Sequence, residues 1–147
     1  MNTKRLLRAI AIAFAAFVFS ACSKDDVKDD SDAFVGTYSV SLTQHVIWGG
    51  DSGTLSDSGT LHITKVSNSR VKTSGYFSTC GEVVGSFIYF EPLQATDGSG
   101  YFTTTFNQGI LVGNVLTFSA NRSGQLAYNG VLYPFRSSDS FTAIKQQ

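Results

Sequence analysis

The chain has 147 residues, and its 11 lysines and arginines balance its 11 aspartates and glutamates. From residue 33 onward, 6 cations face 6 acids without a basic cluster, so we expect no nucleic-acid partner, because nucleic-acid binding depends on neutralising phosphates. This length provides one domain with a hydrophobic core and is too short for two ordinary domains.

The first segment, residues 1–21, has the organisation of a secretory signal. Three cations precede an apolar run at residues 9–19. This run is too short to cross a membrane as a helix but has the usual length for a signal peptide. The small residues Ser20 and Ala21 then stand directly before Cys22. The segment is therefore predicted to be a cleaved signal peptide.

Ser20-Ala21-Cys22 resembles the lipobox of bacterial lipoproteins, with Phe19 where that family prefers leucine. The resemblance implies that Cys22 becomes the first residue of the mature protein and carries a diacylglycerol thioether with fatty acyl chains such as palmitate. Each buried methylene contributes about 0.8 kcal/mol, so two or more chains anchor a protein stably. The expected partner of the N-terminus is therefore a membrane, contacted through a lipid anchor.

Residues 22–32 are rich in aspartate and serine, which is typical of a solvated, flexible tether. Lys24-Asp25-Asp26, close behind the cysteine, is similar to the export signal of surface-displayed lipoproteins of the Bacteroidota. That resemblance implies an outer-membrane protein displayed on the cell surface. The alternative is a lipoprotein that faces the periplasm. Because a lipidated Cys22 leaves Cys80 without a partner in the chain, we expect no disulfide in the domain.

Residues 33–147 have the composition and the period-two alternation of β-strands. We expect strands at residues 34–48, 59–66, 70–79, 82–91, 101–106, 110–112, 115–120, 125–128, 131–135 and 138–144. Gly113-Asn114 and Asn129-Gly130 are two-residue hairpin signals. Residues 49–58 and 94–100 are predicted to be loops.

Short turns between consecutive strands favour an antiparallel up-and-down meander. Since no helix is expected to cover an apolar face, the sheet must close on itself or stack on a second sheet. The predicted fold of residues 33–147 is a single all-β domain, a small closed or partly open barrel of eight to ten strands. A β-sandwich is the alternative.

Phe34-Val35-Gly36-Thr37-Tyr38 resembles the start of the first strand in lipocalins and other calycins, with Tyr38 in place of their tryptophan. In that family an arginine near the last strand packs over the aromatic ring, and Arg136 is the candidate here. The resemblance implies a lipocalin-like barrel whose open mouth holds a small apolar ligand. The whole pattern is also similar to uncharacterised lipocalin-like lipoproteins of the Bacteroidota.

No side-chain pattern predicts catalysis, a metal or a cofactor. His45 and His62 lie on the polar faces of their predicted strands, and the sequence has no Cys-x-x-Cys or His-x-His ligand pair. Glu82 and Glu91 mark the two ends of one predicted strand, roughly 30 Å apart, which is too far for a glycosidase pair. We therefore expect a protein that is not an enzyme.

The candidate ligand-mouth residues are Trp48, Gly49, Gly50 and Tyr38. Our first hypothesis is a membrane-anchored binding module for a small apolar molecule or a glycan. The second is a structural or interaction protein, with a solid barrel that contacts another envelope protein. The barrel interior distinguishes them, because a cavity above about 300 Å³ favours ligand binding and a filled core favours the second.

Overall fold

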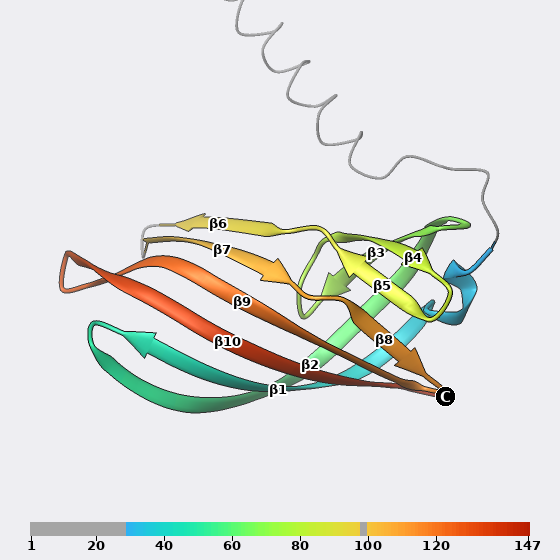
Figure 1. The fold of residues 1–147 in the computed structure, drawn as a ribbon, viewed down its shortest axis with the longest axis horizontal. Helices are drawn as coiled ribbons and strands as arrows, with labels where there is room; N and C mark the ends of the chain where they lie inside the picture. The colour runs from blue at the N-terminus through green and yellow to red at the C-terminus, as the bar shows by residue number, and fades with distance from the viewer. Residues whose placement is uncertain (1–28, 98–99) are drawn as a thin grey trace, which may run out of the picture.

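The computed structural model describes residues 29–97 and 100–147 (Figure 1). The predicted signal peptide and Cys22 lie outside the described residues. A short 3₁₀ helix, η1 (Ser31–Ala33), precedes ten strands. The strands are β1 (Gly36–Trp48), β2 (Asp51–Ser67), β3 (Arg70–Gly75), β4 (Cys80–Val84), β5 (Phe87–Phe90), β6 (Leu93–Asp97), β7 (Gly100–Phe106), β8 (Gly109–Val112), β9 (Val115–Tyr128) and β10 (Val131–Lys145). Within the described part of the chain, no helix is long and apolar enough to cross a membrane.

The strands form a ring in the order β10-β1-β2-β3-β4-β5-β8-β9, which the pairing of β9 with β10 closes. Every pairing is antiparallel. The predicted all-β, barrel-like meander is therefore confirmed. The remaining strands, β7 and β6, lie outside the ring and extend the sheet from β9.

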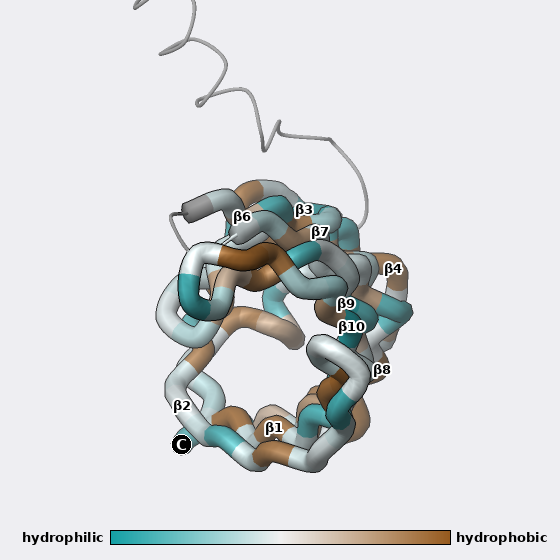
Figure 2. Tube along the Cα trace, turned by 90° about the vertical axis from the view of Figure 1, so that its left-hand side faces the viewer, coloured by the Kyte–Doolittle hydropathy of each residue, from teal (hydrophilic) through white to brown (hydrophobic). Residues whose placement is uncertain are grey.

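The ring is closed at one end of the molecule and open at the other, because β9 changes partner along its length. Residues 115–117 of β9 pair with β8, whereas residues 120–126 pair with β7. On the opposite side, β3 pairs with β2 only from Leu61 onward, so residues 51–60 form the edge of the sheet. Figure 2 looks at the open end, where β1 and β2 lie opposite β6 and β7.

The closed half is filled by its own side chains. The inward residues of β1 in this half, Tyr38, Val40 and Leu42, are all buried, as the alternation predicts. Phe118 and Phe141 stack at its centre, with ring centroids 4.5 Å apart. Further aromatic residues, Phe77, Phe90 and Phe106, pack edge-on or tilted around them. Aromatic packing of this kind fills a small barrel without a ligand.

The first correction concerns residues 49–58, which were predicted to be a loop. Gly49 and Gly50 alone form the turn, with φ values of 60° and 97°. Strand β2 begins at Asp51 and pairs with β1 over residues 51–63. The loop prediction failed because serine, glycine and aspartate are poor strand formers, whereas backbone pairing with a strong neighbouring strand needs no particular side chain.

Two further predictions of secondary structure were wrong. Residues 82–91 are not one strand but the hairpin of β4 and β5, which turns at Gly85 with a φ of 59°. An apolar run on both faces concealed this turn. The loop predicted at residues 94–100 is wrong over residues 94–97, because β6 pairs with β7 from Leu93 to Asp97.

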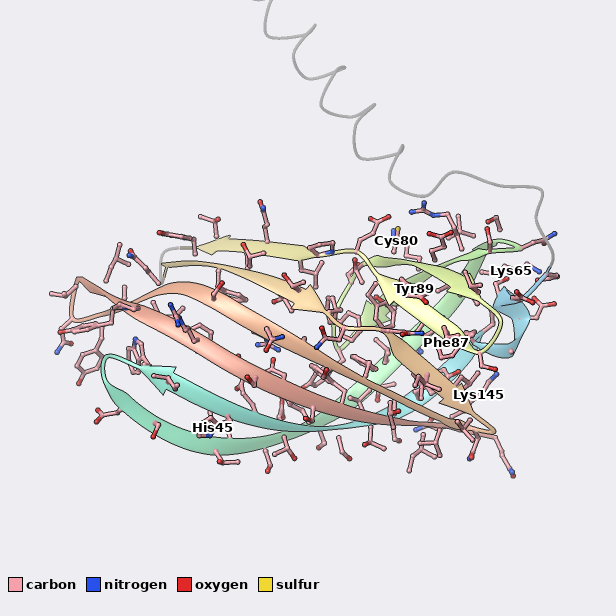
Figure 3. The ribbon with its side chains drawn as sticks, in the orientation of Figure 1. His45, Lys65, Cys80, Phe87, Tyr89 and Lys145 are labelled. Atoms are coloured by element: carbon pink, nitrogen blue, oxygen red, sulfur yellow. The ribbon has the colours of Figure 1, made fainter. Side chains whose placement is uncertain are left out.

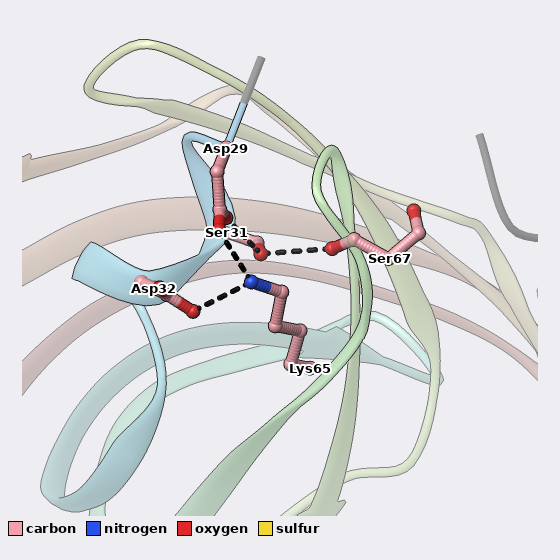
Figure 4. Close-up of polar contacts among 5 residues, drawn as sticks. All are labelled: Asp29, Ser31, Asp32, Lys65 and Ser67. Atoms are coloured by element: carbon pink, nitrogen blue, oxygen red, sulfur yellow. Dashed lines mark hydrogen bonds and ion pairs between the residues drawn. The ribbon is translucent and has the colours of Figure 1, made fainter. Parts of the chain in front are cut away.

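Residues 29–32, assigned to the flexible tether, dock on the barrel at the β2–β3 turn (Figure 4). The amides of Asp30 and Ser31 donate hydrogen bonds to Asn68 O at 2.9 and 3.1 Å. The Ser31 hydroxyl donates to Ser67 O at 2.8 Å and is fully buried. The domain therefore starts about four residues earlier than predicted, because these backbone groups find partners that the sequence does not reveal.

Lys65, on β2, holds the same segment by charge. Its Nζ lies 2.6 Å from Asp29 Oδ2 and 2.8 Å from Asp32 Oδ1. The hydrogen bond donated by Lys65 lowers the pKa of Asp29, and the hydrogen bonds that Lys65 donates to both carboxylates raise the pKa of Lys65.

At the closed end, Lys145 takes the position expected of Arg136. The Tyr38 hydroxyl donates to Phe34 O at 2.8 Å, and Lys145 Nζ lies 6.0 Å from the centre of the Tyr38 ring. Arg136 instead pairs with Ile47 on the exposed outer face, far along the barrel. The prediction that Arg136 packs over Tyr38 is therefore wrong.

Cys80, at the start of β4, is buried. The expectation of a domain without a disulfide stays a prediction. The only other cysteine of the sequence is Cys22, which lies outside the described residues. A sulfur atom that carries a thioether cannot also form a disulfide, so the chemical state of Cys22 is a decisive measurement.

Candidate ligand-binding site

Three of the four predicted mouth residues lie together at the open end of the barrel. Trp48 ends β1, and Gly49 and Gly50 form the turn that follows. The Trp48 ring packs edge-to-face on Tyr128 and Tyr133, with centroids 5.8 and 6.3 Å away. A surface cavity of about 400 Å³ is bordered by these three rings together with Gly49 and Asp51. Trp48 Nε1 is buried and has no hydrogen-bond partner among the described residues.

The fourth predicted residue, Tyr38, does not belong to this mouth. It is on the same face of β1 as Trp48 but ten residues earlier (48 − 38), so roughly 33 Å separate them at the rise of a strand. Its exposed fraction is 0%. Its assignment to the mouth is wrong because a shared strand face does not place two residues at the same end of a barrel.

A second, deeper cavity lies on the inner face where the closed half ends, and we call it the inner cleft. Its volume is about 290 Å³. Strands β6, β7, β9 and β10 and the segment after β3 contribute its walls. The lining residues are Tyr76, Phe77, Leu93, Gln94, Ala95, Phe102, Thr104, Phe106, Arg122 and Phe141. Most of these side chains are apolar, so the cleft offers aromatic walls and a few polar groups, as small-molecule sites commonly do.

An ion pair provides charge at the inner cleft. Arg122 on β9 and Asp139 on β10 both occupy inward positions, and Arg122 Nε lies 2.8 Å from Asp139 Oδ2. The exposed fraction of the Asp139 side chain is 0%, whereas 25% of the Arg122 side chain remains exposed. Burying a carboxylate costs free energy unless a partner compensates its charge. Arg122 supplies that charge and still presents part of its guanidinium to the cleft.

The hydrogen-bonding capacity of Asp139 is not used within the described residues, because both its Oδ1 and its Oδ2 are buried without a hydrogen-bond partner there. The inner cleft therefore combines an unsatisfied acceptor behind its wall with an arginine at its surface. Such an arrangement suits a ligand with hydroxyl or other polar groups beside an apolar body.

Tyr76 forms the wall of the cleft that follows β3. Its hydroxyl donates to Asp57 Oδ2 at 2.9 Å, and its ring lies on Gly59, where an added Cβ would come within 2.5 Å of Cδ2. Burial raises the pKa of Tyr76 to about 12, and the neighbouring carboxylate of Asp57 adds to the effect. The phenol therefore remains neutral and can donate a hydrogen bond at physiological pH.

Sequence reasoning missed Arg122 and Asp139, although a signal was present. Asp139 is in phase with Phe141 and Ala143, which the alternation of β10 places inside the barrel. Arg122 is likewise in phase with Phe118 and Ala120 on β9. A charged residue in phase with buried positions on each of two adjacent strands is the pattern that reveals the pair.

The two histidines are apart, as their registers show. His45 pairs with Thr54 at the open end, and His62 pairs with Thr37 at the closed end. His62 Nδ1 lies 3.1 Å from the Thr37 hydroxyl. Within residues 29–97 and 100–147, no group of three or more histidine, cysteine, aspartate or glutamate side chains is arranged to hold a metal ion.

No known family model matches this chain, and no curated protein matches it in sequence. The functional interpretation therefore depends on the barrel and its inner cleft.

Proposed function

We propose that the protein is a lipid-anchored binding module of the bacterial outer membrane, displayed on the cell surface, which takes a small ligand into the open half of its barrel. It binds without catalysis and without a cofactor. The observation that carries this proposal is the inner cleft, where an exposed part of Arg122 lies among aromatic walls. The lipid anchor is the thioether proposed for Cys22. The alternative location is the periplasmic face of the membrane.

The proposed ligand has an apolar body and a polar end. Phe102 and Phe106 offer apolar surface to the body, and the guanidinium of Arg122 donates hydrogen bonds to the polar end. At the mouth, the ring of Trp48 supplies a further face for a flat or ring-shaped group, with an Nε1 donor beside it. A small apolar molecule with one polar group and a glycan ring both meet this description.

The alternative is a structural lipoprotein that contacts another envelope protein. The filled closed half of the barrel favours it, because Phe118 and Phe141 leave no room there for a ligand. The two proposals differ only in whether the open half of the barrel holds a ligand. The inner cleft and the cavity beside Trp48, of about 290 and 400 Å³, lie close to the volume that ligand sites require.

Native mass spectrometry tests ligand binding directly. The mature protein, purified from membranes, is incubated with envelope lipid and glycan extracts, and a discrete added mass that disappears on denaturation is expected. Arg122→Lys keeps a charge beside Asp139 but loses the planar fork of donors, so it reduces the bound fraction about tenfold. Arg136→Lys, on the exposed outer face, is the matched control and leaves binding unchanged. An unliganded mass in every extract would favour the solid-barrel alternative.

A further inference from the structure

The closed half carries a continuous exposed apolar surface on its outside, which we call the outer patch. It comprises Val84, Phe87, Tyr89, Ile110, Val112 and Ile144. Exposure is high for such residues: 72% for Val112 and 54% for Val84. Register makes the surface continuous, because Val84 is opposite Phe87, and Phe87 is opposite Ile110. Figure 3 shows Phe87 and Tyr89 at the end of the barrel where η1 lies.

The outer patch differs from the outer face of β1 in the same half of the barrel. Along β1, the outward positions in the same half are Thr37, Ser39, Ser41 and Thr43. A polar outer face of this kind is what a barrel in water requires. Clustered apolar residues on one side indicate a surface that contacts something apolar, whereas singly scattered ones need no explanation.

The tether meets the barrel directly beside this patch. The backbone amide of Gly85, in the turn between Val84 and Phe87, donates a hydrogen bond to Asp30 Oδ2 at 2.9 Å. Cys22 precedes Asp29 by only seven residues (29 − 22). An extended chain of seven residues spans at most about 25 Å. A lipid attached to Cys22 therefore holds the bilayer within that distance of the outer patch.

We propose that the outer patch rests on the lipid bilayer into which the acyl chains of Cys22 insert. This inference rests on the proposed lipid anchor. The domain is then held by two contacts, the acyl chains and the apolar side chains around Phe87. The short tether and the outer patch together fix one orientation of the domain on the membrane. The closed half lies at the membrane, and the mouth at Trp48 is directed away from it.

Fluorescence quenching by brominated lipid tests this orientation. The lipidated full-length product is reconstituted in phosphatidylcholine vesicles with brominated acyl chains. Phosphatidylcholine is chosen so that the charge of the membrane surface does not contribute to the interaction. Two single-tryptophan proteins are compared in a Trp48→Phe background: Phe87→Trp in the patch and Thr54→Trp on the exposed strand β2 at the open end. We expect at least twofold quenching of Phe87→Trp and none of Thr54→Trp. Matching circular dichroism spectra verify that both variants fold.

Flotation of the same vesicles reports on the anchor separately. If the protein floats with the vesicles but Phe87→Trp is not quenched, or both tryptophans are quenched equally, the anchor stands and the patch proposal is overturned. If the protein lacks an acyl mass and does not float, both proposals fail. If Phe87→Trp is protected from bromine in a dimer that Phe87→Asp dissociates, the patch binds a second copy of the chain, and the membrane proposal is likewise overturned.

Discussion

Asp139 is fully buried on β10, and the Nε of Arg122 on β9 lies 2.8 Å from its Oδ2. Removing one member of a buried ion pair leaves an uncompensated charge and typically costs about 3–5 kcal/mol. Arg122→Leu is therefore expected to lower the free energy of unfolding by roughly that amount. The double variant Arg122→Leu/Asp139→Leu is expected to be more stable than Arg122→Leu alone. Urea unfolding of the three variants and the parent measures both differences, and a double variant no more stable than Arg122→Leu would contradict this account.

Alkaline pH is expected to destabilise the fold. Burial raises the pKa of Tyr38 to about 12, and burial and Asp57 raise that of Tyr76 to about 12, from a usual value of 10.0. Between these values the unfolded chain releases protons that the folded protein retains. The stabilising contribution of the two tyrosines to the free energy of unfolding is therefore complete below pH 10 and is lost as the pH rises toward 12. Urea unfolding at successive pH values should show this decline, with a smaller slope in Tyr76→Phe. An equal slope in that variant would count against the role of Tyr76.

The cluster of Lys65, Asp29 and Asp32 is expected to order the start of the domain with little effect on global stability. Lys65→Ala should increase hydrogen exchange at the amides of Asp30 and Ser31, which donate to Asn68. The free energy of unfolding should change little, since the pair is partly exposed. Lys72→Ala, on the exposed face of β3, is the control. Unchanged exchange in Lys65→Ala would show that the backbone hydrogen bonds alone hold this segment.

The intact mass of the membrane-derived protein tests the proposed state of Cys22. A lipid anchor predicts the mass of residues 22–147 plus a diacylglyceryl group, concentrated after proteolysis in the N-terminal peptide. Since the sequence has one other cysteine, Cys80, the contrary outcome is also defined. A polypeptide mass lowered by two hydrogens, without acyl groups, would join Cys22 to Cys80 in a disulfide and exclude the anchor. Treatment with a reductant, which restores two hydrogens only in the second case, is the control.

Local patterns in the sequence were sufficient for much of the fold. Alternation on β1 placed Tyr38, Val40 and Leu42 inside, and Asn129-Gly130 forms the expected tight turn, with φ values of 50° and 78°. Such features depend on residues close together in the chain. The extension of β2 into residues 51–58 could not be predicted in the same way, because a partner strand, not local propensity, makes that segment extended.

The site was predicted less well than the fold because it depends on position along the barrel as well as on strand face. Trp48 lies at the open end of the barrel, next to a turn, whereas Tyr38 shares its face of β1 but belongs to the opposite end. Arg122 and Asp139 come together only through the pairing of β9 with β10. Their contact needed the strand register, which the sequence does not state directly.

From the change of partner along β9 we also expect two parts of the protein that differ in local stability. Strand β6 and the first half of β2 each have a ladder on one side only, whereas the strands of the closed half are paired on both sides. We expect the amides of β6 and of the first half of β2 to exchange with solvent by local fraying. The amides around Phe118 are expected to exchange only through global unfolding. A ligand that bridges the two free edges would slow the faster class selectively, so occupancy of the barrel can be read from backbone amides before the ligand itself is identified.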